Sequence, residues 1–229
     1  MIIITGASKG IGRYLFDRFR DEDFPVVGTR NSTIEGIARD LDLYSKVDIS
    51  DYDQVRTWVD RLTPQLSNII LINCAGISYT CFAHKSDINL WKEIIHVNIV
   101  GTFNVIHCLL PLMRTQKYGR IINFSSVVTK LPTPGVSAYA TSKAGLIGLT
   151  KSLAVENASL GITANAISLG YASLGMGVCS VSEQYQEIMK QRIPAGRFCN
   201  PAEIYNTVRY FIDTEYINGS NVDLNGGLI

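Results

Sequence analysis

A tyrosine and a lysine stand four residues apart at Tyr139 and Lys143, the spacing that places two side chains on one face of a helix. An ammonium group beside a phenol favours the phenolate, so Lys143 would lower a tyrosine pKa that is about 10 when unperturbed. A tyrosine tuned in this way donates or accepts a proton in catalysis. The same pair also occurs on helix faces that only meet water, so the neighbouring motifs must decide between the two interpretations.

A glycine-rich stretch covers residues 5–12 with the spacing GxxxGxG. It follows an apolar run at residues 2–4 and precedes a helical pattern at residues 11–19, which predicts a strand, a tight turn and a helix. Glycines at such a turn leave backbone N–H groups and the helix N-terminus open toward a pyrophosphate. The spacing differs from the GxGxxG of many dinucleotide-binding proteins, and an ordinary glycine-rich turn is the alternative interpretation.

The end of the next predicted strand, residues 26–28, bears on which dinucleotide would bind. NAD-binding proteins carry an acidic residue there, which hydrogen-bonds the ribose 2′-hydroxyl. This chain instead has Thr29 followed by Arg30, and Lys9 lies in the glycine-rich turn, so two cations would meet a 2′-phosphate. The sequence therefore favours NADP(H) over NAD(H). The alternative is that both cations are solvated surface charges, and Glu35 is close enough in sequence to complicate the choice.

These residues need a frame that brings distant segments together. Short, mostly apolar runs without alternation are typical of parallel strands covered on both faces, and they occur at residues 2–4, 26–28, 46–47, 69–73, 120–124, 163–167 and 222–224. Helical patterns separate them at residues 11–19, 91–106, 146–153, 182–192 and 204–212. This alternation predicts the α/β class: one Rossmann-type domain over residues 1–229, with a doubly wound, mostly parallel seven-stranded sheet and helices on both faces.

Composition excludes several function classes. Lys and Arg number 21 against 20 for Asp and Glu, and this formal charge of +1 argues against a nucleic-acid binder, which usually has a basic excess. The five cysteines are odd in number and widely spaced, as expected of reduced thiols. No His, Cys, Asp or Glu cluster has metal-ligand spacing, so we expect no metal site.

Two further observations bear on location. The N-terminus lacks a basic segment, and its apolar run is too short for a signal peptide. The longest apolar candidate for a membrane span, residues 94–113, is interrupted by polar residues and Pro111. We therefore expect a cytoplasmic protein without membrane contact.

Further motifs match along essentially the whole chain, and together they resemble the short-chain dehydrogenase/reductase family. The resemblance rests on the order and intervals of the turn at residues 5–12, Asp48-Ile49, Asn73-Cys74-Ala75-Gly76, Asn98, Ser126, and Tyr139 with Lys143. It implies that Tyr139 is the general acid and that Ser126 polarises the substrate carbonyl. It also implies that Lys143 holds the nicotinamide ribose and that Asn98 holds a water linking Lys143 to solvent.

The resemblance further implies a set of cofactor contacts: Gly6, Ser8, Lys9, Gly10, Ile11, Gly12, Arg30, Asn31, Asp48, Ile49, Asn73, Ala75, Gly76, Tyr139, Lys143 and Gly170. Three features depart from the family pattern. Ser168-Leu169-Gly170 stands where the family usually has Pro-Gly, and Leu174 displaces a threonine that often binds the nicotinamide amide. Cys74 replaces the second asparagine of the NNAG motif. The segment 31–47 is short, which predicts an abbreviated helix after the second strand.

Residues 169–192 contain the least regular stretch of the chain, and we expect them to form a substrate-binding loop or lid. The segments 119–126, 138–152 and 193–197 look most like 3-oxoacyl-[acyl-carrier-protein] reductases. The sequence thus predicts NADPH-dependent reduction of a ketone, such as a 3-oxoacyl thioester carried on acyl carrier protein or coenzyme A. A sugar, polyol or secondary-metabolite ketone is the alternative substrate. A catalytically silent NADP(H)-binding sensor or scaffold is the alternative of another class.

The apolar faces of residues 91–113 and 138–158 exceed what one face of a sheet needs. In the family, the equivalent helices pair between subunits, so the resemblance implies a homodimer or homotetramer.

Overall fold

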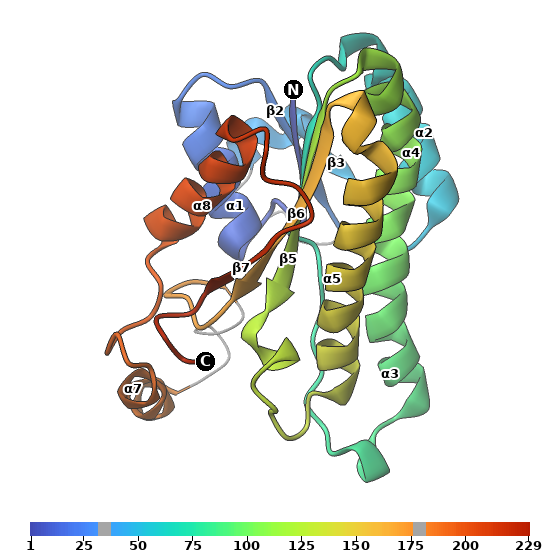
Figure 1. Cartoon of the computed structure of the whole chain (residues 1–229). Coiled ribbons are helices and arrows are strands. Elements are labelled where there is room, and N and C mark those ends of the chain that lie inside the picture. The colour runs from blue at the N-terminus through green and yellow to red at the C-terminus, as the bar shows by residue number, and fades with distance from the viewer. Residues whose placement is uncertain (32–37, 176–181) are drawn as a thin grey trace.

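The computed structural model describes residues 1–31, 38–175 and 182–229, and its centre is one sheet of seven strands (Figure 1). The strands lie in the order β3-β2-β1-β4-β5-β6-β7, and every neighbouring pair is parallel. Their bounds are β1 (Ile2–Thr5), β2 (Val26–Arg30), β3 (Tyr44–Lys46), β4 (Ile70–Asn73), β5 (Gly119–Ser126), β6 (Ile162–Leu169) and β7 (Asn221–Leu224). The predicted α/β fold class is confirmed, and each predicted strand overlaps one of these seven.

Helices cover both faces of the sheet (Figure 1). On one face lie α1 (Gly10–Asp21) and α8 (Pro201–Asp213), and on the other lie α2 (Tyr52–Leu62), α4 (Thr102–Gln116) and α5 (Ser137–Asn157). The helix α3 (Ile88–Ile95) continues into α4, and α7 (Glu183–Arg192) lies near the carboxyl ends of the strands. The chain thus has the layered architecture that positions a site at one edge of a parallel sheet.

Two apolar clusters, one on each face, explain why the strands show no alternation. Ile2 and Ile4 pack on the side of α1 and α8, where Phe19 and Phe211 are also fully buried. Ile3 points the other way, into the cluster formed by α2, α4 and α5. Because successive strand residues point to opposite faces, both faces need apolar side chains. Each such side chain contributes roughly 1.5–3 kcal/mol when fully buried.

The helical pattern predicted over residues 91–106 changes its geometry in the middle. The segment His96–Gly101, centred on the buried Asn98, is a π-helical turn between α3 and α4. Such turns are rare and are frequent at functional sites. Within the same run, the Thr102 hydroxyl donates to the Asn98 carbonyl oxygen at 2.9 Å. Periodicity alone gave no sign of this interruption, because a π turn shifts the register of the helix without breaking it.

The sequence predicts no membrane span, yet the helical run Ile88–Gln116 is long and apolar enough to cross a membrane by length and composition. In this fold 44% of its most apolar window is buried inside the protein. This is weak evidence for a span, because buried core helices meet the same criterion.

The segment between β2 and β3 agrees with the predicted abbreviated helix where it is described, as a 3-10 helix at Ala38–Leu43. Residues 32–37, with Glu35, and residues 176–181, with Cys179, lie outside the described residues. The other cysteines, Cys74, Cys81, Cys108 and Cys199, are free thiols. In the described part of the chain, no group of three or more His, Cys, Asp or Glu side chains could hold a metal ion.

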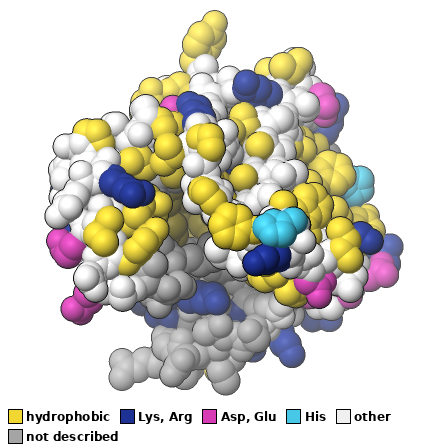
Figure 2. Space-filling model, turned by 90° about the horizontal axis from the view of Figure 1, so that it is seen from below, with side chains coloured by type: hydrophobic (Ala, Val, Ile, Leu, Met, Phe, Trp, Pro, Cys, Tyr) yellow, Lys and Arg dark blue, Asp and Glu magenta, His cyan; other side chains and the backbone are white. Residues whose placement is uncertain are grey.

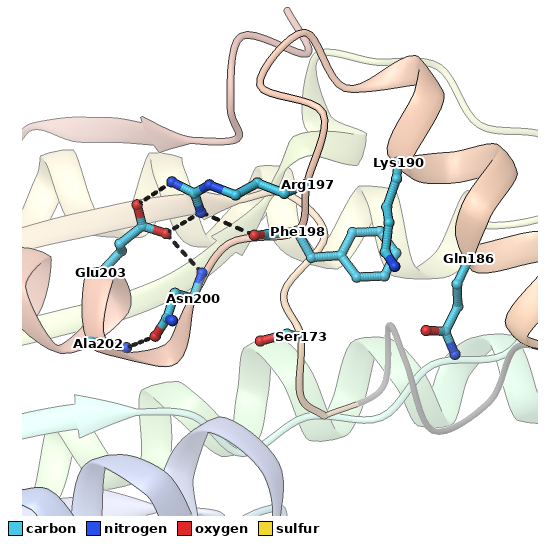
Figure 3. A pocket seen from close by; sticks show the side chains of 8 residues that line it. All are labelled: Ser173, Gln186, Lys190, Arg197, Phe198, Asn200, Ala202 and Glu203. Carbon is cyan, nitrogen blue, oxygen red and sulfur yellow. Dashed lines mark hydrogen bonds and ion pairs between the residues drawn. The ribbon is translucent and has the colours of Figure 1, made fainter.

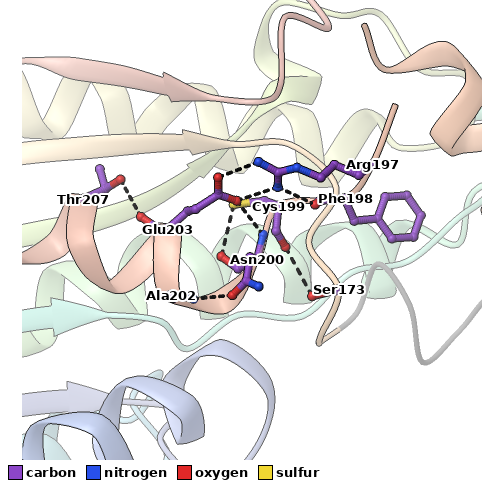
Figure 4. Close-up of polar contacts among 8 residues, drawn as sticks. All are labelled: Ser173, Arg197, Phe198, Cys199, Asn200, Ala202, Glu203 and Thr207. Carbon is purple, nitrogen blue, oxygen red and sulfur yellow. Dashed lines mark hydrogen bonds and ion pairs between the residues drawn. The ribbon is translucent and has the colours of Figure 1, made fainter. Parts of the chain in front are cut away.

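Polar contacts fix the start of α8 and tie it to the preceding segment (Figure 4). Asn200 caps the helix by accepting from the Ala202 N–H at 2.9 Å, and Glu203 accepts from the Asn200 N–H at 2.7 Å. Arg197 donates to both oxygens of the same carboxylate, at 2.7 and 2.8 Å. The hydrogen bonds from Arg197 and Asn200 hold the pKa of Glu203 down at about 2.

The lowered pKa of Glu203 predicts that the natural protein is more stable than a variant without this carboxylate over a defined range of pH. A carboxyl whose pKa is lowered by folding stabilises the protein above its unfolded pKa, and loses that contribution as the pH falls through the folded value. We therefore expect Glu203→Gln to have a lower Tm than the natural protein at pH 7, and the gap to close between about pH 4.5 and 2. Thermal unfolding followed by circular dichroism measures the gap.

The control is Glu187→Gln, whose carboxylate makes an exposed ion pair with Lys190. It should leave the Tm at pH 7 nearly unchanged, because exposed pairs of this kind contribute little. A gap between Glu203→Gln and the natural protein that stays constant down to pH 2 would contradict the assignment.

Candidate active site

The sheet changes its direction of winding between β1 and β4. From β1 the chain builds β2 and β3 on one side, and it then builds β4 to β7 on the other. In open α/β sheets, a ligand crevice forms at this switch point, outside the carboxyl ends of the strands. The glycine-rich turn follows β1 and the Asn73–Gly76 motif follows β4, so the two motifs meet there. A Cβ on Gly6 would lie 2.7 Å from Ala75 Cα, so only glycine allows this approach.

The glycine-rich turn leaves the start of α1 open. A Cβ on Gly12 would lie 2.4 Å from the Gly6 carbonyl oxygen, so the turn can be this tight only with glycine there. Lys9 stands at the N-cap position, and no side chain caps the helix from that position. The free N–H groups and the positive end of the helix dipole favour an anion. The turn therefore fits the pyrophosphate of a dinucleotide.

The end of β2 carries the side chains predicted to choose the dinucleotide. The Thr29 hydroxyl accepts from the Gly6 N–H at 3.2 Å, so Thr29 braces the turn. The Nε atom of Arg30 is buried and has no hydrogen-bond partner among the described residues. The parallel register of β2 and β3 places Lys46 beside Arg30, and Asn31 is exposed. Two adjacent cations with an orphaned donor suit an anionic group with several acceptor oxygens.

Asp48 and Ile49, the expected adenine contacts, follow β3. One Asp48 carboxylate oxygen accepts from the backbone N–H and the hydroxyl of Ser50, at 2.9 and 2.6 Å. The Ile49 carbonyl oxygen accepts from Asn104 Nδ2 at 3.0 Å, and its side chain packs against Gly101. The π-helical segment and α4 therefore fix Ile49, and Ser50 fixes the Asp48 carboxylate.

Ser126 and Tyr139 come together at the carboxyl end of β5. Ser126 is the last residue of that strand, and Tyr139 lies in the first turn of α5. Burial raises the pKa of Tyr139 above its ordinary value, and a hydrogen bond with Ser126 acts in the opposite direction. Ser126 Oγ also accepts from the Val128 N–H at 3.4 Å. The serine hydroxyl hydrogen is thus left to point at the tyrosine or at a carbonyl oxygen placed between them.

Lys143 is buried one turn further along α5. Its Nζ atom donates to the Phe124 carbonyl oxygen at 2.7 Å and lies 5.5 Å from the centroid of the Tyr139 ring. Burial lowers the pKa of Lys143 to about 8, and the nearby Cys74 thiol acts in the opposite direction. We expected the ammonium to lower the pKa of Tyr139, but here it bonds to the backbone of β5, and burial dominates at the tyrosine.

Asn98 acts as a clamp in this structure. Its Oδ1 accepts from the Ile77 N–H at 2.8 Å, and its Nδ2 donates to the Ile77 carbonyl oxygen at 2.9 Å. The second Nδ2 hydrogen goes to Ser142 Oγ at 3.0 Å. The water expected at Asn98 stays a prediction, and such a water could only donate to Asn98 Oδ1 or to the backbone carbonyl oxygen, because both Nδ2 hydrogens are already used.

Among the predicted cofactor contacts, Asn73 uses its side chain inside the fold. Asn73 Nδ2 donates to Asn123 Oδ1 at 2.9 Å, and Asn123 Nδ2 donates to the Thr150 hydroxyl at 2.9 Å. Ala75 and Gly76 instead offer only backbone, at the crevice. A Cβ on Gly76 would lie 3.2 Å from Asn98 Oδ1 and 3.7 Å from Lys143 Nζ, which places this turn beside two predicted catalytic residues.

Sequence reasoning missed the residues that hold the predicted tetrad in place. The Ser125 hydroxyl donates to the Lys143 carbonyl oxygen at 2.9 Å, and Ser142 bonds to Asn98. Ser142 lies three residues after Tyr139, so the sequence already placed it on the same face of the helix as the tyrosine. Ile77 gave no signal, because it contributes only backbone atoms.

The first part of the predicted loop at residues 169–192 is anchored. Leu169 ends β6, and the Gly170 N–H donates to the Leu224 carbonyl oxygen at 2.9 Å. The Cys199 N–H donates to the Tyr171 carbonyl oxygen at 2.9 Å, and the Ser173 N–H donates to the Cys199 carbonyl oxygen at 3.0 Å. The described residues that follow the gap form α7. The lid role of residues 169–192 stays a prediction. The first residues of this segment, up to Ser173, are anchored to β7 and to Cys199.

Figure 2 views the molecule from the side on which the strands end, and hydrophobic side chains gather there on both sides of a hollow. The start of α3, its preceding loop and α7 lie at this end in Figure 1. They carry the exposed side chains Phe82, Ile88, Tyr185 and Ile188. The rim of the site thus carries several exposed apolar side chains among polar ones where the structure describes it.

A separate cavity of about 670 Å³ opens between α7, the segment around Ser173 and the start of α8 (Figure 3). Its lining residues are Ser173, Gln186, Lys190, Arg197, Phe198, Asn200, Ala202 and Glu203. None of the four predicted catalytic residues is among them. Its charges are paired within the protein, Arg197 with Glu203 and Lys190 with Glu187. We therefore attribute the cavity to the way α7 packs against the segment before α8, where Met189 and Lys190 contact Phe198, and not to the reaction.

Comparison with known proteins finds one family along most of the chain. The profile of the family described as short chain dehydrogenase matches residues 1–184. The 3-oxoacyl-[acyl-carrier-protein] reductase FabG of Staphylococcus aureus (strain Mu50) is 34% identical over 238 residues, which cover 99% of this chain and 96% of the relative. The protein of the same name from Thermotoga maritima is 33% identical, with the same coverage.

Solved structures give the same fold. The aldohexose dehydrogenase of Thermoplasma acidophilum, in ligand-free form, superposes with a TM-score of 0.90 at 29% identity, covering 99% of this chain and 92% of that one. A protein described as a short chain dehydrogenase/reductase family protein gives a TM-score of 0.86 at 24% identity, and it supports the fold alone.

The buried ammonium of Lys143 gives a prediction about stability. A lysine whose pKa is lowered by folding reduces the free energy of unfolding at pH values where it is charged in both the folded and the unfolded state. This destabilisation disappears at pH values where the lysine is neutral in both states. Relative to Lys143→Met, the natural protein should therefore gain at most about 3 kcal/mol of unfolding free energy between about pH 8 and 10.5. Urea unfolding at pH 7.5 and 10 measures the difference, and Lys151→Met, an exposed lysine on the same helix, is the control. If the difference in unfolding free energy from the natural protein changed equally with pH for Lys143→Met and Lys151→Met, the lowered pKa of Lys143 would be refuted.

Proposed function

This chain belongs to the short chain dehydrogenase family of oxidoreductases, and from that premise we propose that it reduces a ketone to a secondary alcohol with NADPH. The catalytic residues of this proposal are Asn98, Ser126, Tyr139 and Lys143. The observation that carries it is the convergence of a buried lysine, a partly buried tyrosine and a serine at the carboxyl end of β5, beside the switch point of the sheet.

The proposed mechanism assigns one task to each side chain. Ser126 accepts from the Val128 N–H, so its own hydrogen is free to donate to the substrate carbonyl oxygen and polarise it. Tyr139 then protonates the oxygen as it gains negative charge, and a pKa raised by burial keeps the tyrosine protonated for this step at neutral pH. Lys143 would hold the nicotinamide ribose when the cofactor is bound, and its positive charge would stabilise the tyrosinate that remains. Asn98 keeps the turn after β4 in place through Ile77.

The residues present fit a nicotinamide dinucleotide, which would supply the hydride when bound. The uncapped start of α1 and its glycines suit the pyrophosphate. The orphaned Arg30 Nε, with Lys46 beside it, supports NADP(H) over NAD(H), because a 2′-phosphate would supply acceptor oxygens and negative charge. Lys9, at the N-cap of α1, is a further candidate contact of that phosphate.

We propose a 3-oxoacyl thioester, carried on acyl carrier protein or coenzyme A, as the substrate. The names of the curated relatives support this choice, as do the exposed apolar side chains of Phe82, Tyr185 and Ile188 at the rim of the site. A sugar ketone or aldose is the second candidate substrate, because the solved structure that superposes with a TM-score of 0.90 is named an aldohexose dehydrogenase. A catalytically silent sensor would need no reactive residues, and the presence of all four argues against it.

Two further parts of the proposal concern assembly and location. The exposed side chains Val100 and Phe103 on the outer face of the π-helical segment and α4, with Val155 on α5, support a homodimer or homotetramer. The proposal also includes a cytoplasmic location without membrane contact, and the near-neutral charge of the chain supports the absence of nucleic-acid partners.

The proposal is tested by following NADPH oxidation at 340 nm with acetoacetyl-CoA, a 3-oxoacyl carrier protein and a panel of sugar ketones. We expect turnover of the thioesters, and a loss in kcat of about 10²- to 10⁴-fold in Tyr139→Phe, because the phenol is the proton donor. NADPH binding, followed by fluorescence, should survive in that variant. If only the sugar compounds were turned over, the second candidate substrate would replace the thioesters in the proposal. Full activity of Tyr139→Phe would refute the mechanism.

Cofactor choice is tested separately at the end of β2. Arg30→Asp places a carboxylate beside the expected 2′-phosphate, so it should weaken NADPH binding much more than NADH binding. Titration calorimetry with both cofactors gives the two dissociation constants. Arg56→Asp, an exposed arginine on α2, is the control for the change in net charge. Equal losses for NADPH and NADH in Arg30→Asp would overturn the preference for NADP(H).

A further inference from the structure

Ser142 is a buried hydroxyl between the two reactive side chains of α5. It lies three residues after Tyr139 and directly before Lys143, and none of its surface is exposed. Its Oγ donates to the Tyr139 carbonyl oxygen at 2.7 Å. The same oxygen accepts from Asn98 Nδ2 at 3.0 Å. The serine therefore joins the backbone that carries Tyr139 to the π-helical segment that carries Asn98.

The direction of these hydrogen bonds is fixed by chemistry. An amide nitrogen only donates, so Ser142 Oγ must accept from Asn98, and its single hydrogen is then committed to the Tyr139 carbonyl oxygen. Asn98 is also fully buried, and its remaining donor and its acceptor are both used by Ile77. Ser142 thus takes the last amide hydrogen of Asn98. Without it, this buried donor would lack a partner, and the link between Asn98 and α5 would be lost.

The first turns of α5 are held from two sides. Ser142 links them to Asn98, and the Ser125 hydroxyl at the end of β5 donates to the Lys143 carbonyl oxygen at 2.9 Å. Lys143 Nζ returns a hydrogen bond to the Phe124 carbonyl oxygen at 2.7 Å. At Tyr139 the phenol meets Ser126 of β5, and Ser142 binds the backbone carbonyl oxygen. At the start of α5, Trp91 of α3 donates to the Ser137 hydroxyl at 3.3 Å.

From this arrangement we propose that Ser142 is a positioning residue for the proton-transfer step, which rests on the proposed function. It sets the Tyr139 phenol by tying the tyrosine backbone to the Asn98 clamp. Small displacements of a reacting group lower the rate steeply while leaving binding almost unchanged. Loss of the hydroxyl should therefore reduce kcat and shift the titration of Tyr139, with little effect on KM or on NADPH binding.

The same helix offers a matched control. Two turns further along, the Thr150 hydroxyl accepts from Asn123 Nδ2 at 2.9 Å and donates to the Leu146 carbonyl oxygen at 2.7 Å. This is the same bridge from an asparagine through a buried hydroxyl to a helix carbonyl, but it does not reach Tyr139. Thr150→Val and Ser142→Ala therefore remove equivalent contacts, and only the second concerns the reacting tyrosine.

The experiment compares Ser142→Ala, Ser142→Thr and Thr150→Val in the full-length protein by thermal unfolding, NADPH affinity and the pH dependence of ketone reduction. Ser142→Ala should lower kcat by about 10- to 100-fold with KM and NADPH affinity within about 2-fold. Thr150→Val should lose comparable thermal stability and keep kcat within about 2-fold. Ser142→Thr, which keeps the hydroxyl, should recover much of the rate. Equal kcat in Ser142→Ala and Thr150→Val would reduce Ser142 to a structural role.

A second readout does not depend on turnover. In protein labelled with ¹³C at the tyrosine ring carbon that bears oxygen, the Tyr139 resonance is assigned by its absence in Tyr139→Phe. We expect its titration midpoint to move by about 0.5 pH unit or more in Ser142→Ala and to stay in place in Thr150→Val. An unmoved midpoint overturns the inference even if no substrate is turned over. Turnover that survives in Tyr139→Phe would instead overturn the proposed function.

Discussion

The parallel pairing of β1 with β4 is the constraint on which the candidate site depends. It sets Thr5 opposite Asn73, so that the turns leaving both strands emerge at the same edge of the sheet. Gly6 then meets Ala75 so closely that no Cβ fits between them, and the Ala75 N–H donates to the Thr5 hydroxyl at 3.2 Å. Every predicted cofactor contact and catalytic residue is placed relative to this junction, because the remaining strands extend from it in both directions.

Buried polar groups connect the elements of the site, because each of them forms a hydrogen bond to another element. Asn98 holds the turn after β4, Lys143 holds the end of β5, and Ser142 joins α5 to the π-helical segment. A buried polar group without a hydrogen-bond partner lowers the stability of the fold by about 1–3 kcal/mol, so an arrangement that breaks one of these contacts is strongly disfavoured. The same burial sets the electrostatics, since it lowers the pKa of Lys143 and raises that of Tyr139.

The comparisons separate what relatives share from what distinguishes them. A chain 34% identical to a 3-oxoacyl-[acyl-carrier-protein] reductase superposes at a TM-score of 0.90 on an aldohexose dehydrogenase. Sheet and fold are therefore common to proteins named for very different substrates. The difference must come from the elements around the carboxyl edge, such as α7 and the loop before α3, because loops on a fixed scaffold carry specificity.

By itself the sequence determined the strands, the glycine-rich turn and the tyrosine–lysine pair, because these follow from local patterns of a few residues. The apolar runs without alternation led to a sheet covered on both faces, which the two core clusters confirm. Only the tertiary structure decided the π-helical turn at Asn98, the bond from Lys143 to the Phe124 carbonyl oxygen and the bridge through Ser142. These contacts join residues 19 and 44 positions apart, and one of them ends on a backbone atom that no residue type reveals. Such partners are chosen by how the helices pack against the sheet, which periodicity does not encode.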